Sequence, residues 1–100
     1  MRQIIWTNFA ISELKNIFLY YRMVAGDKVA VKIRKSIFNS TKPLIKHPFI
    51  GPIEENLIDL KQEHRYLVEG NYKILYRLDK NNIYITDIFD CRQNPSKMKR

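Results

Sequence analysis

Apolar residues recur at helical spacing through the first part of the chain. A short apolar run at residues 3–6 comes first and predicts a strand. Thr7 or Asn8 then supplies the N-cap of a first helix, which Gly26 is placed to end. The apolar positions of this helix repeat at steps of three and four: Ala10, Leu14, Ile17, Phe18, Tyr21 and Val24. A strand followed by a long amphipathic helix is therefore predicted.

A second helix is predicted to begin with Asp27 as its N-cap. Pro48 marks the latest possible end of this helix, and Pro43 could end or kink it earlier. One stripe carries its apolar residues, Ala30, Ile33, Ile37 and Leu44. If the helix persists, five lysines share a narrow arc on the other side: Lys28, Lys32, Lys35, Lys42 and Lys46. These lysines are either an ordinary solvated face or a contact for RNA or another polyanionic target.

Residues 47–64 break the helical periodicity with two prolines and a glycine. A connection of this length in a compact domain is usually functional or mobile. Within it, residues 55–60 are compatible with a helical turn or a short strand.

Three strands are predicted in the last third of the chain, at residues 65–69, 72–78 and 82–90. Two-residue turns separate them and fix the register, which places Glu69 opposite Tyr72 and Asp79 opposite Asn82. The result is an antiparallel meander. With the preceding elements it predicts an α+β fold of order β-α-α-β-β-β, in which a two-helix hairpin packs on one face of a small, mostly antiparallel sheet.

This register divides the meander into two faces. The face predicted to lie under the helices is apolar except for Arg65 and Asp87, and its other members are Leu67, Tyr72, Ile74, Tyr76, Leu78, Ile83, Ile85 and Phe89. The opposite face, here called the basic face, carries His64, Tyr66, Lys73, Arg77, Tyr84 and Thr86, with Val68, Leu75 and Ile88 among them. Arg77 is expected opposite both His64 and Tyr84, so basic and aromatic groups converge there.

Length and composition predict a single domain over residues 1–100, with 45% hydrophobic residues to form a core. Eighteen Lys and Arg against ten Asp and Glu give a net charge of +8, which favours a polyanion or an acidic protein as partner over a merely soluble basic domain. The single cysteine excludes an intramolecular disulfide. The sequence lacks the apolar stretches of a signal peptide or a membrane span, so we expect a cytoplasmic protein without membrane contact.

The candidate chemistry is confined to the basic face and its surroundings. His47, His64 and Cys91 are scattered and the three glycines stand alone, so neither a metal nor a cofactor is expected. Basic groups interleaved with tyrosines are suited to binding RNA, because the Lys and Arg side chains attract the phosphates and the bases stack on the tyrosine rings. An ordinary exposed sheet face is the alternative.

If this face were catalytic, the reaction would be metal-independent RNA cleavage. That reaction needs a base for the 2′-hydroxyl proton, cations for the charge on phosphorus and an acid for the leaving oxygen. The candidates for stabilising charge are Lys73, Arg77 and Arg92. The candidates for proton transfer or base stacking are His64, Tyr66 and Tyr84, each of which could be structural. Whether the protein is an enzyme stays open at this point.

Three segments carry a family resemblance: "IIWTNFAISELKNIFLYY", "HRYLVEGNYKILYRL" and "DIFDCRQNPSKM". With this order of elements, the chain resembles the RelE/ParE superfamily of toxins from bacterial type II toxin–antitoxin modules. The resemblance implies a growth-inhibiting toxin neutralised by a cognate antitoxin. A homodimer and a toxin–antitoxin hetero-oligomer both stay open, because the sequence does not give the oligomeric state. It also implies that Arg92 is the strand-end arginine at the edge of the active surface, and that Lys73 replaces a family arginine.

Two activities are known in that superfamily. RelE-like members cleave messenger RNA in the ribosomal A site, whereas ParE-like members poison DNA gyrase and are not nucleases. Met98 stands about where RelE-like toxins place a catalytic tyrosine, and the long first helix and the Arg-x-x-Pro ending look more like ParE. The resemblance therefore favours gyrase, with the ribosome-dependent endonuclease as alternative. A basic RNA- or protein-binding module without activity is a third interpretation.

Overall fold

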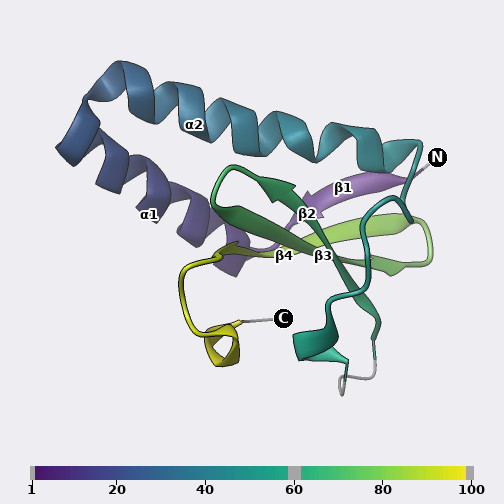
Figure 1. Cartoon of the computed structure of the whole chain (residues 1–100). Coiled ribbons are helices and arrows are strands. Elements are labelled where there is room, and N and C mark those ends of the chain that lie inside the picture. The colour runs from purple at the N-terminus through teal and green to yellow at the C-terminus, as the bar shows by residue number, and fades with distance from the viewer. Residues whose placement is uncertain (1, 59–61, 99–100) are drawn as a thin grey trace.

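The computed structural model describes residues 2–58 and 62–98 and has two helices lying across one face of a four-stranded sheet (Figure 1). Its helices and strands are β1 (Gln3–Trp6), α1 (Asn8–Ala25), α2 (Asp27–Ser40), β2 (His64–Glu69), β3 (Tyr72–Asp79) and β4 (Asn82–Asp90). Short 3-10 turns lie at Lys42–Ile45, Glu55–Leu57 and Pro95–Lys97. The predicted α+β fold and its β-α-α-β-β-β order are confirmed.

The strands lie in the order β1-β4-β3-β2. β1 runs parallel to β4, because the two helices carry the chain across one face of the sheet, whereas β2, β3 and β4 form the predicted antiparallel meander. Glu69 lies opposite Tyr72 and Asp79 opposite Asn82, so the register set by the two turns is confirmed.

Local capping sets the limits of the helices. The Thr7 side-chain oxygen accepts a hydrogen bond from the Ala10 amide at 3.2 Å, as an N-cap of α1 should. Gly26, at φ 95°, ends α1 and also precedes α2 as its N-cap. Asp27 is therefore the first residue of α2 and not its cap, and its carboxylate lies near the positive end of the helix dipole.

Helix α2 ends at Ser40, well before the latest limit set by Pro48. Pro43 lacks an amide hydrogen and sits in the 3-10 turn that follows, and the Thr41 hydroxyl donates to the Phe38 carbonyl at 2.8 Å. Lys42 and Lys46 consequently lie beyond α2. The expected arc of five lysines is wrong, and only Lys28, Lys32 and Lys35 lie on this helix.

The main core lies between the helices and the sheet. Its buried residues are Ala10, Ile17, Ile37, Leu44, Tyr72, Ile74, Tyr76, Ile83, Ile85 and Ile88. Leu67 and Leu78 pack against this cluster while partly buried. The apolar face predicted for the first two strands of the meander therefore packs under the helices as expected.

The last strand of the meander, β4, departs at a β-bulge from the predicted alternation of side chains between the two faces. Tyr76 lies opposite Ile85, but Leu75 lies opposite Asp87, so β4 carries one extra residue at this point. A one-residue shift reverses the face of every later side chain. Ile88 accordingly joins the helix-side core, and Phe89 packs against Leu75 on the other side, which corrects the faces predicted for both residues.

Candidate functional site

The basic face is partly covered by other segments of the chain. The C-terminal turn and the segment between α2 and β2 lie on the side of the sheet away from the helices (Figure 1). A second buried cluster of Leu75, Phe89 and Met98 forms there, with Leu57 and Tyr66 packed against it. The sequence predicted no such layer, because its parts come from segments without apolar periodicity.

The covering segment, residues 47–58, is here called the strap. It is held along the outer edge of β2, where the Glu54 amide donates to the His64 carbonyl at 2.8 Å and the Tyr66 amide donates to the Pro52 carbonyl at 3.1 Å. Its 3-10 turn at Glu55–Leu57 matches the helical turn considered for residues 55–60; residues 59 and 60 lie outside the described residues.

Tyr76 anchors the strap from within the core. Its hydroxyl accepts a hydrogen bond from the Gly51 amide at 3.0 Å and donates one to the Pro48 carbonyl at 2.9 Å. A β-carbon on Gly51 would lie 2.3 Å from the Tyr66 carbonyl oxygen, so only glycine allows this close approach. The strap is therefore tied to both the edge and the interior of the sheet.

Lys73 is paired within the fold. Its Nζ lies 2.8 Å from Glu54 Oε1 and 4.3 Å from the centre of the Tyr66 ring. Glu54 is only 2% exposed. Burial would raise the pKa of Glu54, but hydrogen bonds from Lys73 and Asn56 outweigh it and hold this pKa below its usual value. The charge of Lys73 is thus largely neutralised, and no pattern in the sequence indicated Glu54 as its partner.

Arg77 lies opposite both His64 and Tyr84, as the register predicted. Its guanidinium carbon is 4.4 Å from the centre of the Tyr84 ring. His64 is 3% exposed, and its Nδ1 lies 2.9 Å from the Gln62 carbonyl oxygen. This burial keeps the imidazole away from any substrate on the surface, whereas Arg77 and Tyr84 remain partly accessible.

Arg92 lies apart from Lys73 and Arg77, just beyond the end of β4. Its guanidinium makes two hydrogen bonds to the Asp90 carboxylate, at 2.6 and 2.9 Å, and the Arg92 amide makes a third at 2.9 Å. The side-chain bonds from Arg92 are the main reason that the pKa of Asp90 lies below its usual value. The Arg92 side chain is still 64% exposed, so these hydrogen bonds hold its guanidinium in a defined position at the surface.

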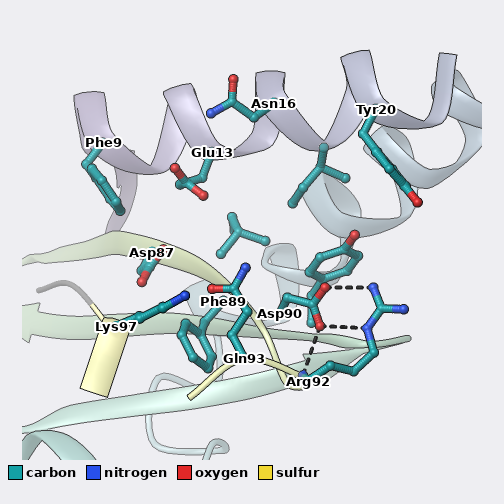
Figure 2. A pocket seen from close by; sticks show the side chains of 13 residues that line it. Phe9, Glu13, Asn16, Tyr20, Asp87, Phe89, Asp90, Arg92, Gln93 and Lys97 are labelled. Carbon is teal, nitrogen blue, oxygen red and sulfur yellow. Dashed lines mark hydrogen bonds and ion pairs between the residues drawn. The ribbon is translucent and has the colours of Figure 1, made fainter. Parts of the chain in front are cut away.

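Arg92 lines a groove of about 520 Å³ between α1 and the end of β4, here called the α1–β4 groove (Figure 2). One wall is a stripe of α1: Phe9, Glu13, Asn16, Ile17 and Tyr20. The other wall comes from the sheet and the C-terminal turn: Tyr72, Asp87, Ile88, Phe89, Asp90, Arg92, Gln93 and Lys97. Figure 2 shows Phe9, Glu13 and Tyr20 projecting from the helix toward the strand side.

Sequence reasoning missed the helical wall of this groove. Phe9, Glu13, Asn16 and Tyr20 are spaced by four, three and four residues, which places them on one face of α1. That spacing was present in the sequence, but the stripe mixes polar and aromatic residues and the apolar stripe beside it was the stronger signal. The structure thus separates the predicted site residues into the basic face under the strap and Arg92 in the groove.

Over residues 2–58 and 62–98, no three His, Cys, Asp or Glu side chains are arranged to hold a metal ion. The same part of the chain contains no helix that is long and apolar enough to cross a bilayer.

Comparison with known proteins assigns the class. Residues 4–95 match the model of a family described as "ParE toxin of type II toxin-antitoxin system, parDE". The chain therefore belongs to the ParE toxin family, and its resemblance to the RelE/ParE superfamily is confirmed. The protein is a toxin of the type II class, whose partner is a cognate antitoxin.

A solved structure supports the same fold. It is described as "Chromosomal ParDE TA system from P. aeruginosa" and matches with a TM-score of 0.75 and 22% sequence identity, over 90% of this chain and 96% of that chain. A search of curated proteins found no match.

Proposed function

We propose that this toxin acts on DNA gyrase and does not cleave RNA. The observation that carries the proposal is the position of Met98, which stands about where RelE-like toxins place a catalytic tyrosine. Met98 is 8% exposed and packs against Leu75 and Phe89. A thioether transfers no proton, so this position supports the core and supplies neither acid nor base.

The other groups on the basic face support the same conclusion. A nuclease needs an accessible base and an unpaired cation near the reacting phosphate. Here His64 is buried, and Lys73 is bound to Glu54. Tyr66 is the aromatic partner of Lys73, so it is already occupied as well.

One observation favours the RelE-like alternative. Arg77 and Tyr84 are stacked, partly accessible and on the same face of β3 as Lys73. A cation held against an aromatic ring can bind phosphate beside a stacked base. If the strap moved away, Lys73, Arg77, Tyr66 and Tyr84 would form the RNA surface that the sequence suggested.

Primer extension on a reporter message in a purified translation system separates the two activities. We expect no new cuts when the toxin is added, because the required proton-transfer groups are buried or paired. Cuts at ribosomal A sites would contradict the proposal and assign Lys73, Arg77 and Arg92 to catalysis. A gyrase-directed toxin would also act in the cytoplasm, where gyrase and its DNA are located.

We further propose that the cognate antitoxin occupies the α1–β4 groove in a toxin–antitoxin hetero-oligomer. The groove has apolar walls from Phe9, Ile17 and Tyr20 and an exposed, fixed guanidinium from Arg92 at its rim. A segment with apolar anchors and a carboxylate would match both features. Occupancy would also cover Arg92, which accounts for neutralisation if Arg92 contacts the target.

The antitoxin proposal is tested with the purified complex. A stoichiometric complex should not inhibit growth or gyrase, and Tyr20→Ala should weaken antitoxin binding by about tenfold or more through lost apolar contact. Lys80→Ala, at the exposed turn between β3 and β4 and not among the residues that line the groove, is the control. Full inhibition by the complex, or unchanged binding by the Tyr20 variant, would place the antitoxin elsewhere.

A further inference from the structure

Helix α2 presents a regular row of lysines to solvent. Lys28, Lys32 and Lys35 are spaced by four and three residues and are all exposed. Ala30 and Ile37 are buried on the opposite side of the same helix. The row, here called the lysine row, spans about 10 Å at 1.5 Å per residue.

The surroundings of the lysine row are unusually one-sided in charge. Between Lys15 and Lys46, Asp27 is the only acidic residue in the sequence. The ion pairs among the described residues all lie elsewhere, at Arg65, Lys73 and Arg92. Glu69 of β2 lines a pocket with Lys32 but makes no ion pair with it, so Asp27 and Glu69 offset only part of the positive potential of this helix.

Two arginines on the helical hairpin add to the same charge. The guanidinium carbons of Arg34 and Arg22 lie 4.3 and 5.7 Å from the centre of the Phe18 ring. Stacking restricts both side chains, so less conformational entropy is lost when they meet an anion. The helical hairpin therefore carries six cations, Lys15 included, and two of them are held in place.

The chemistry of the lysine row identifies the kind of polyanion. Protein interfaces have apolar centres and are depleted in lysine, but the exposed apolar residues of α2, Val29 and Phe38, lie about a quarter turn to either side of the row. Single-stranded RNA is bound by stacking its bases on exposed aromatic rings. The tyrosines that line a pocket with Lys32 are Tyr72, which is buried, and Tyr21, which is hydrogen-bonded to it at 3.4 Å. A straight row of exposed ammonium groups that contains no aromatic residue suits the regular phosphates of a duplex.

We propose that α2 binds the phosphate backbone of double-stranded DNA through Lys28, Lys32 and Lys35. This binding should not depend on the DNA sequence. Lysine ammonium groups attract phosphates by charge and do not make the bidentate hydrogen bonds to base edges that distinguish one base pair from another. It goes beyond the proposed action on gyrase, since the toxin would contact DNA itself. On a gyrase–DNA complex, α2 would hold the duplex while other residues meet the protein.

The test is fluorescence anisotropy of a labelled duplex of roughly 20 base pairs, titrated with the full chain over a series of salt concentrations. We expect binding at low salt that weakens steeply as salt rises. The triple variant Lys28→Gln, Lys32→Gln, Lys35→Gln should lower the slope of log affinity against log salt by about three, one for each phosphate contact. The charge-retaining triple arginine variant should keep the wild-type slope.

A matched control removes the same charge elsewhere. Lys15→Gln, Lys46→Gln, Lys80→Gln changes three exposed lysines outside the row and should leave most of the slope intact. Equal losses in the two triple variants would overturn the proposal, because net charge alone would then explain binding. It would also be overturned by an unbound duplex at low salt, or by tighter binding of single-stranded RNA of equal length. None of these measurements contains gyrase, so they succeed or fail separately from the proposed function.

Discussion

The two faces of the sheet are covered in different ways. On one face, α1 and α2 bury a continuous apolar cluster that includes Ile74, Ile83 and Ile85. On the other face, the strap and the C-terminal turn cover a smaller cluster around Leu75, and the Lys73–Glu54 ion pair lies beside it. Stability is therefore concentrated under the helices, and the second face depends on a few specific contacts.

The largest expected effect comes from the helix-covered face. Ile85→Ala removes a fully buried side chain and should lower the free energy of unfolding by about 2–5 kcal/mol, because lost burial and a residual cavity add together. Urea unfolding followed by circular dichroism measures this change. The matched control is Ile11→Ala, an exposed position on α1 that should change stability by about 0.5 kcal/mol or less.

The next largest loss of stability is expected from a substitution in the strap. Gly51→Ala places a methyl group against the Tyr66 carbonyl oxygen and should cost about 1–3 kcal/mol through forced displacement of the strap. Proteolysis of the native protein should then cut within residues 47–58 faster than in the wild type. An unchanged melting temperature and cleavage pattern would mean that the strap does not pack this closely.

The ion pair that joins Glu54 of the strap to Lys73 of β3 should contribute less to the free energy of unfolding, and its contribution should depend on pH. Glu54→Gln removes a buried carboxylate and leaves Lys73 without its partner, at an expected cost of about 1–2 kcal/mol at neutral pH. The pKa of Glu54 is lower in the folded state than its ordinary value of 4.5, so its stabilisation is present above that pH and is lost as the pH falls through the folded pKa.

Unfolding curves of the wild type and of Glu54→Gln, recorded between pH 7 and pH 3, test the direction of this pH dependence. The difference between wild type and Glu54→Gln should shrink as the solution becomes acidic. A difference that stayed constant or grew on acidification would show that Glu54 is not stabilised as a carboxylate.

The smallest stability effect is expected at Arg92. Arg92→Ala removes an exposed side chain and should leave the free energy of unfolding almost unchanged, as is usual for exposed ion pairs. We nevertheless expect it to abolish growth inhibition, because we propose that Arg92 contacts the target. Lys97 is another exposed cation that lines the groove. The variant Lys97→Ala shows whether the loss of any positive charge from the groove is enough to abolish growth inhibition.

Lys73→Ala should behave differently from Arg92→Ala. Removing Lys73 leaves the buried Glu54 carboxylate without its cation, so part of any lost toxicity would come from lost stability. A Lys73 variant that was as stable as the wild type would show that the ion pair contributes nothing measurable.

The helix-covered face could be predicted from the sequence because its signals are local. Ala10 and Ile17 follow helical spacing, Gly26 ends a helix, and two-residue turns set the strand register. The second face could not be predicted, because the Glu54–Lys73 contact joins residues nineteen apart and the strap has no periodicity.

The β-bulge shows where local reasoning failed within a correctly predicted strand. Alternation placed Asp87 among apolar neighbours, and this inconsistency was the one visible sign of the extra residue in β4. Similarly, the prediction that five lysines share one arc of α2 was wrong because the helix ends before Pro43, a residue that lacks the amide hydrogen needed to continue it. In both cases a single residue contradicted the pattern around it and marked the error.

We propose that this ParE-family toxin inhibits gyrase and that Arg92 is one of the residues that contact it. The most direct test is supercoiling of relaxed plasmid by purified gyrase, with the wild-type toxin, with Arg92→Ala and with no toxin. We expect the wild type to block supercoiling and Arg92→Ala not to block it, although both proteins are folded. Normal supercoiling in the presence of folded wild-type toxin would contradict it.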